Sequence, residues 1–181
     1  MDDDTLTTAT GFEAAPALVA GIRDALWLSR DGEIETLSHR ETHARIRDGV
    51  RPIVCHSRLT AETIRAGTFQ GFDILELFAF VRPAVFCLPT PSGVAQSLDL
   101  PHPDGAEQTA AMLFQAADIL LNELGGAPPE AKDIAWTMAR AGWPWGAAVL
   151  TRFGGGEAPH SSALKGAMQV WRRLPDWEDR P

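Results

Sequence analysis

Few side chains in this sequence stand at the spacings that catalysis or metal binding requires. His39 and His43 are four residues apart, the separation at which two imidazoles on one helix face can share a metal ion. A zinc protease needs a glutamate directly after the first histidine, whereas Glu41 comes two positions later and no third ligand stands out. Ser162 and Lys165 match the SxxK pattern of serine acyl-enzymes without its accompanying motifs. We therefore interpret the histidines as part of a solvated helix face and assign no catalysis to the SxxK pattern.

The glycine-rich sequences that bind nucleotides are also missing. The chain contains no GxxxxGK[ST], GxGxxG or GxSxG motif. A P-loop motor needs a lysine at the end of a glycine loop, and neither Lys132 nor Lys165 follows one at that spacing. We therefore expect this chain to have no cofactor of its own.

Length and composition describe one ordinary globular domain. The chain has 181 residues, 45% of them hydrophobic, and its 24 acidic against 16 basic residues give a net charge of −8. Such a chain has no general attraction to nucleic acid or to anionic lipid. No apolar run approaches the length of a membrane span, the N-terminus does not resemble a secretory signal, and the two cysteines, Cys55 and Cys87, form no CxxC pair. These features predict a cytoplasmic protein with no membrane partner.

The order of the expected elements indicates a mixed α/β fold. We expect residues 1–16 to be a disordered acidic tail and residues 17–124 to form an α/β domain. Ser38 and Glu41 make a capping box before a helix at 39–48, and residues 52–55 are apolar on both faces, as buried parallel strands are. The remaining expected elements are strands at 17–20, 25–29 and 33–37, helices at 60–67, 94–98 and 106–124, and a strand that passes into a helix at 72–80.

The last part of the chain is rich in tryptophan. Five of the six tryptophans lie in residues 130–181, which we expect to form a small helical appendage. Their indoles can pack into a small aromatic core, which we favour, or stack on nucleic-acid bases. Trp143 and Trp145 are the candidates for base stacking.

Four segments follow one another in an informative order: IVCHS at 53–57, FDILEL at 72–77, LPTPSGVAQSL at 88–98 and GAEQTAAML at 105–113. Together they resemble the latter half of a DnaQ-like (DEDDh) 3′–5′ exonuclease domain. The resemblance implies an RNase H-like fold, a mixed sheet with helices packed on it.

The acidic residues that such an exonuclease uses are missing at the positions that can be matched. The family holds two metal ions with four carboxylates and uses a histidine as general base. The first strand, residues 17–21, contains no acid. The remaining degenerate positions are His56, Ser57, Ala61, Asp73, Asp104 and Thr109, with Ala61 and Thr109 standing where the family has aspartates and Asp104 where it has the histidine.

A second resemblance covers nearly the whole chain. The segments ELFAFVRP at 76–83, FCLPTP at 86–91, WTMARAGWPW at 136–145 and VWRRLPDW at 170–177 carry it. They resemble the N-terminal region of bacterial DinG-type (Rad3-related) ATP-dependent DNA helicases. In that family a helicase core follows this region, so ATP and Mg²⁺ are expected only for a core in cis or on a neighbouring chain.

These resemblances imply a non-catalytic accessory domain, or a fragment, of an ATP-dependent DNA helicase that contributes DNA binding or packs on the motor. The alternative is a protein-interaction or scaffold domain without affinity for nucleic acid, which the net charge of −8 favours. An active 3′–5′ exonuclease ranks third, because the required acids are missing.

Overall fold

The computed structural model describes residues 11–155 of the chain. Trp171, Trp177 and the SxxK pattern at Ser162 and Lys165 lie outside the described residues.

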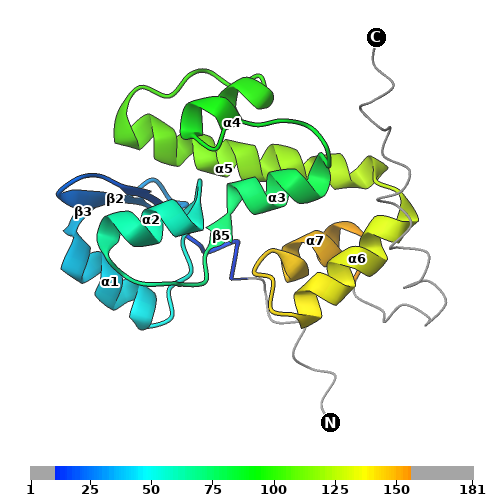
Figure 1. Ribbon diagram of the computed structural model, residues 1–181, viewed down its shortest axis with the longest axis horizontal. Coiled ribbons are helices and arrows are strands. Elements are labelled where there is room, and N and C mark those ends of the chain that lie inside the picture. Colours follow the sequence, from blue (N-terminus) through cyan, green and yellow to red (C-terminus); the bar gives the residue numbers. More distant parts are fainter. Residues whose placement is uncertain (1–10, 156–181) are drawn as a thin grey trace.

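A mixed sheet of five strands organises the molecule (Figure 1). Its strand order is β3-β2-β1-β4-β5. The strands β1 (Ala17–Ala20), β2 (Asp24–Leu28) and β3 (Ile34–Ser38) pair antiparallel, whereas β4 (Ile53–Val54) and β5 (Phe72–Asp73) run parallel to β1. Ile53 pairs with both Ala17 and Phe72, so the expected pairing of the segments near 53 and 72 is confirmed, and so is the α/β class.

The first two helices begin where side chains can satisfy their free backbone N–H groups. In α1 (His39–Arg47), the Ser38 hydroxyl accepts from the N–H of Glu41 at 3.3 Å, and the Glu41 carboxylate accepts from the N–H of Ser38 at 2.9 Å. The expected capping box is thus confirmed. In α2 (Ser57–Ile64), Nδ1 of His56 accepts from the N–H of Leu59, so the helix begins three residues before the expected Thr60.

The later helices follow the expected order with shifted boundaries. The helix α4 (Pro91–Ser97) begins at a proline and is capped by Thr90, so the expected start at residue 94 is too late. The helix α5 (Gly105–Glu123) is the longest of the described helices, as expected. The remaining helices are α3 (Ile74–Val81), α6 (Pro129–Arg140) and α7 (Gly146–Arg152), with a 3₁₀ turn at Leu124–Gly126 after α5.

The two faces of the sheet are covered differently. Figure 1 shows α3, α4 and α5 on one side and α1 on the other. Ala17 and Leu18 are successive residues of β1, and they belong to the apolar clusters on opposite faces, as the period of two in a strand requires. The larger cluster lies beneath α5, and the smaller one, with Trp27, lies beneath α1.

Two of the expected boundaries are wrong. Residues 11–16 are not part of a disordered tail, because Phe12 is only 4% exposed and its ring lies 5.7 Å from that of Phe72 and 5.1 Å from that of Trp145. The helices α6 and α7 are not a separate appendage, since Ala135 and Val149 belong to the same apolar core as Phe72. The apolar faces of two short helices need a larger surface to cover them, and the sheet layer supplies it.

Candidate functional site

The strands β1 and β4 are neighbours in the sheet, and the chain continues from β1 to β2 on one side and from β4 to β5 on the other. Open α/β sheets commonly bind ligands at the carboxyl ends of two strands related in this way. A hollow of about 180 Å³ lies at the carboxyl ends of β1 and β4. It is lined by the end of β1, the residues after β4, the start of α4 and the first turns of α5: Leu18, Val19, Ala20, Cys55, His56, Pro89, Pro91, Thr109 and Leu113, with three residues of α2, Leu59, Thr60 and Thr63.

The side chains around this hollow carry no carboxylate. Its polar groups are threonine hydroxyls, the His56 imidazole and the Cys55 thiol. Burial raises the pKa of Cys55 to about 12, with smaller contributions from the negative charges of Asp73 and Cys87. The thiol is therefore protonated near neutral pH and is a poor nucleophile.

A larger cavity of about 990 Å³ lies between α2 and α3. Four of the six positions identified from the exonuclease resemblance line it: His56, Ser57, Ala61 and Asp73. His56 lines both the cavity and the hollow, so the two lie side by side. Ala61 has no polar side chain and is buried in α2.

Asp73 has the contacts of a structural residue. It is only 4% exposed, and its Oδ1 accepts from the backbone N–H groups of Leu75 and Glu76 at 2.9 and 3.3 Å. Its Oδ2 accepts from the N–H of Ser57 at 2.6 Å, at the start of α2. One carboxylate therefore accepts hydrogen bonds from free backbone N–H groups in the first turns of two helices, and both of its oxygens are used.

Glu76 lies next to Asp73 at the start of α3. Its Oε2 accepts a hydrogen bond from the Trp143 indole at 3.2 Å. Partial burial and the Asp73 carboxylate raise the pKa of Glu76, against smaller opposing effects of Trp143 and His56. Glu76 therefore holds its proton to a higher pH than a free glutamate does.

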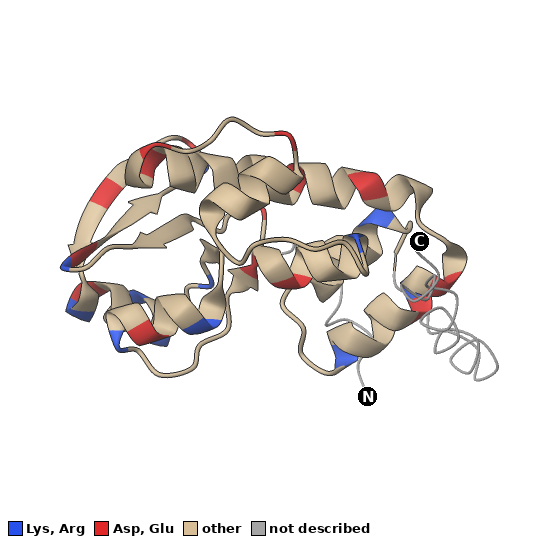
Figure 2. Ribbon diagram, turned by 45° about the horizontal axis from the view of Figure 1, so that its top comes forward, with Lys and Arg blue, Asp and Glu red and all other residues tan. Residues whose placement is uncertain are grey.

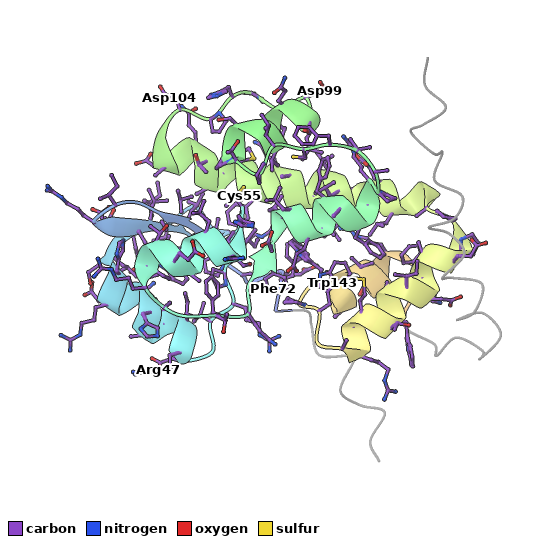
Figure 3. The ribbon with its side chains drawn as sticks, viewed as in Figure 1. Arg47, Cys55, Phe72, Asp99, Asp104 and Trp143 are labelled. Carbon is purple, nitrogen blue, oxygen red and sulfur yellow. The ribbon has the colours of Figure 1, made fainter. Side chains whose placement is uncertain are left out.

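Asp104 and Thr109 do not join Asp73. Asp104 is exposed at the start of α5 and makes no side-chain cap there, and it lines neither the hollow nor the larger cavity. Thr109 is buried, lines the hollow and donates its hydroxyl proton to the Gly105 carbonyl at 2.7 Å. The structure thus brings together only part of the expected set (Figure 3).

Trp145, one of the two candidates for base stacking, is not available for it. Trp145 is fully buried, packs 5.1 Å from the Phe72 ring and donates its indole N–H to the Asp73 carbonyl at 2.7 Å. The aromatic core that we favoured is present, and it also includes Phe72 of the sheet. Trp143 is partly buried, and its ring lies 5.0 Å from that of Phe80.

The histidine pair carries no metal-binding arrangement. Nε2 of His39 lies at hydrogen-bond distance, 3.0 Å, from the Gly21 carbonyl, so its ring ties α1 to the turn after β1. Within residues 11–155, no three His, Cys, Asp or Glu side chains are grouped so that they could hold a metal ion. None of the helices in this range is both long and apolar enough to cross a membrane.

Comparison of the chain with protein-family models, with curated proteins and with solved structures finds no match.

Sequence reasoning missed several residues that shape this region. In the sequence, Cys55 stood out only as a cysteine without a CxxC partner, and Pro89 and Pro91 only as parts of a motif. All three line the hollow. Their positions depend on how the connection between α3 and α4 folds back over the end of β4, which no local pattern encodes. The apolar strand at 52–55 was the signal that could have drawn attention to Cys55, because ligands bind at strand ends.

Proposed function

We propose that this chain is a catalytically inactive, RNase H-like exonuclease domain that serves an ATP-dependent DNA helicase of the DinG type as an accessory domain. The single observation that carries the proposal is the lining of the hollow at the ends of β1 and β4, where an exonuclease needs carboxylates and this chain has Val19, Ala20 and Thr109.

The strand order supports the RNase H-like part of the proposal. Three antiparallel strands followed by two parallel ones, with the order β3-β2-β1-β4-β5, agree with the mixed sheet that the exonuclease resemblance implies. The segments of that resemblance also lie at corresponding places, with His56 after β4, Asp73 in β5 and Thr109 in the first turns of α5.

The contacts of the remaining acids support the inactive part. Asp73 uses both carboxylate oxygens to cap helices, and Asp104 lies on the surface. Asp73 and Asp104 are therefore not placed to hold together the metal ions that would neutralise charge on a phosphodiester.

A nuclease assay tests this proposal. The purified chain is incubated with end-labelled single-stranded DNA in Mg²⁺ or Mn²⁺, and the expected result is no shortening of the strand above a heat-treated control. Shortening that disappears in Asp73→Ala or Asp104→Ala would overturn the inactive assignment.

The accessory role requires a motor. A DinG-type helicase core is purified with and without this chain, and ATP hydrolysis and strand unwinding are measured. We expect a stable complex in which the chain changes the rate of unwinding. The chain alone should not hydrolyse ATP, because Lys132 lies inside α6 with no glycine loop before it. A core whose rates and elution are unaffected by the chain contradicts the role.

One surface feature favours the second candidate, a protein-interaction domain without nucleic-acid affinity. The connection between α3 and α4 exposes Val85, Phe86 and Leu88, and Phe86 is 81% exposed. Exposed apolar side chains in one segment are typical of protein-binding sites. If this candidate is right, Phe86→Ser weakens the complex with the helicase core, and the chain binds no oligonucleotide at low salt.

A further inference from the structure

Three arginines near the C-terminal ends of α1 and α2 have no charged partner. Arg47, Arg51 and Arg65 are exposed, and none forms an ion pair within residues 11–155. Four other arginines of the described chain are paired with carboxylates: Arg30 with Asp118, Arg45 with Glu35, Arg58 with Glu62 and Arg82 with Glu123. Within residues 11–155, Arg23, Arg40, Arg140 and Arg152 also form no ion pair, but they do not line either depression described below. Within residues 11–155, no carboxylate pairs with the guanidinium groups of Arg47, Arg51 and Arg65, which leaves them open to an anion.

These arginines line two connected depressions. A hollow of about 260 Å³ is lined by His43, Arg47 and Arg51, together with Thr68 and Phe69. Thr68 and Phe69 also line the 990 Å³ cavity, whose near end carries Arg65. The two depressions meet at Thr68 and Phe69, and we call them together the arginine groove.

The part of the arginine groove that contains Arg51 lies at the opposite end of β4 from the hollow with Cys55. Arg51 comes just before β4, whereas Cys55 comes just after it. Figure 3 places Arg47 at the outer end of α1, away from Cys55 and Asp104. The end of the groove with Arg47 and Arg51 thus lies apart from the hollow with Cys55, whereas its other end is the larger cavity described above, which shares His56 with that hollow.

Charge is distributed unevenly over the molecule. Figure 2 shows basic and acidic positions interspersed on α1 and α2, whereas α5 and the loop before it carry acidic positions. Glu35 on β3 and Glu62 on α2 are each bound to an arginine, and Glu62 itself lines the larger cavity. Asp48 lies beside Arg47 in sequence, and Asp73 and Glu76 line the far end of the larger cavity. An anion is therefore attracted to the near end of the groove and repelled from the far end.

Helix ends explain only part of this pattern. A basic residue in the last turn of a helix is favoured by the helix dipole, and this accounts for Arg47 in α1. Arg51 lies outside any helix, and Arg65 adopts a left-handed backbone conformation with φ of 54° after α2. The convergence of the three on one groove is not required by helix stability.

We propose that the arginine groove binds the phosphate backbone of single-stranded nucleic acid. Arginine forms paired hydrogen bonds with phosphate oxygens, and Thr68 and Gln70 place hydroxyl and amide groups in the same groove. Phe69 adds an aromatic surface that lines both depressions, which suits a base and not an acidic peptide. This inference does not depend on the nuclease ancestry of the fold or on the helicase role.

Anisotropy of a fluorescein-labelled 20-nucleotide DNA strand, titrated with the full chain, tests the proposal. With three phosphate contacts, the logarithm of the binding constant should fall with the logarithm of salt concentration with a slope of about −2. Arg47→Glu combined with Arg51→Glu should weaken binding at least about tenfold. The salt dependence should also become shallower, with a slope between 0 and about −1.

Two variants serve as controls. Arg23→Glu combined with Arg152→Glu makes the same change in net charge at exposed arginines elsewhere and should change binding by less than about threefold. Phe69→Leu keeps the apolar packing, and it should weaken binding about fivefold or more without changing the salt slope. Circular dichroism establishes that each variant is folded.

Three outcomes overturn the proposal. They are absence of binding by the unmodified chain at about 50 mM salt, an equal loss in the two charge-reversal variants, and displacement of the DNA by polyglutamate as effectively as by unlabelled oligonucleotide. The last outcome assigns the groove to an acidic protein segment. None of these outcomes changes the nuclease and ATPase results, so the two proposals fail separately.

Discussion

At the scale of single residues, the polar side chains that the motifs single out make structural contacts. Asp73 stands where the exonuclease resemblance has an aspartate, yet its carboxylate caps α3 and holds the start of α2. His56, another of the degenerate positions of that resemblance, caps α2 with its Nδ1. Polar side chains at strand ends are well placed to satisfy the free N–H groups of the next helix, with or without catalysis.

Removing the Asp73 carboxylate should destabilise the fold. Asp73→Ala leaves three backbone N–H groups without their acceptor, and we expect a loss of about 2–4 kcal/mol in the free energy of unfolding. Urea denaturation followed by circular dichroism measures it. Asp104→Ala is the matched control, since Asp104 makes no side-chain cap, and it should cost less than about 0.5 kcal/mol. Equal losses in the two variants would contradict the capping role.

Glu76 should make stability depend on pH. Its pKa in the folded chain is raised above 4.5, so the folded state binds its proton more tightly than the unfolded chain does. Ionising Glu76 therefore costs stability as pH rises from about 4.5 through its raised pKa, and the cost is absent at lower pH.

The variant Glu76→Gln removes this titration and keeps an oxygen for the Trp143 indole. Its stability relative to the unmodified chain should increase as pH rises from about 4 to 7 and then become constant. Denaturation at several pH values measures this difference. A difference that is flat, or that shrinks with rising pH, contradicts the raised pKa.

At the scale of elements, close backbone approaches decide which helices pack together. Gly146 begins α7 against α6, where a Cβ on this residue would lie 2.6 Å from the Cα of Ala139. Gly125, in the turn after α5, has no heavy atom within 4 Å of such a Cβ. The first glycine is required by packing and the second is not.

These two glycines provide a matched pair of variants. Gly146→Ala should destabilise the chain by about 1–3 kcal/mol, because α6 and α7 must move apart. Gly125→Ala should be neutral or slightly stabilising, since it restricts the unfolded chain without a clash. Thermal unfolding of both variants tests this, and a harmless Gly146→Ala would mean that α6 and α7 do not pack as closely as described.

At the scale of the whole molecule, one apolar core joins the sheet layer to the last two helices. Trp145 from the turn before α7 packs on Phe12 and Phe72 and bonds to the Asp73 backbone. These residues come from the start, the middle and the end of the described chain. We therefore expect residues 11–155 to unfold as a single cooperative unit.

Trp145 tests this cooperativity. Trp145→Ala should cost about 3–5 kcal/mol and lower the midpoint of far-ultraviolet circular dichroism and of tryptophan fluorescence together. Trp145→Phe keeps an aromatic ring and loses the hydrogen bond to Asp73 and part of the buried ring volume, so it should cost less than Trp145→Ala. Two separated transitions, with only one of them shifted by Trp145→Ala, would instead indicate an independent C-terminal unit.

Local patterns in the sequence were sufficient for the elements. Alternating and continuous apolar runs predicted the strands. The Ser38–Glu41 capping box predicted α1, and the apolar stripe of residues 106–124 predicted α5. These predictions succeeded because hydrogen bonding and burial within one element depend on neighbours a few residues away. The boundaries that failed depended on longer contacts. The start of α2 is set by His56 and by Asp73, which lies sixteen residues further along the chain.

The sequence by itself determined the α/β class, the order of the elements and the lack of acids in residues 17–21. Only the tertiary structure decided that Phe12 and Trp145 belong to one core with Phe72, and that Arg47, Arg51 and Arg65 converge on one groove. The reason is physical. Short-range geometry mainly decides which residues form a helix or a strand. The burial and the electrostatic potential at a site depend on side chains that the fold brings together from distant parts of the chain.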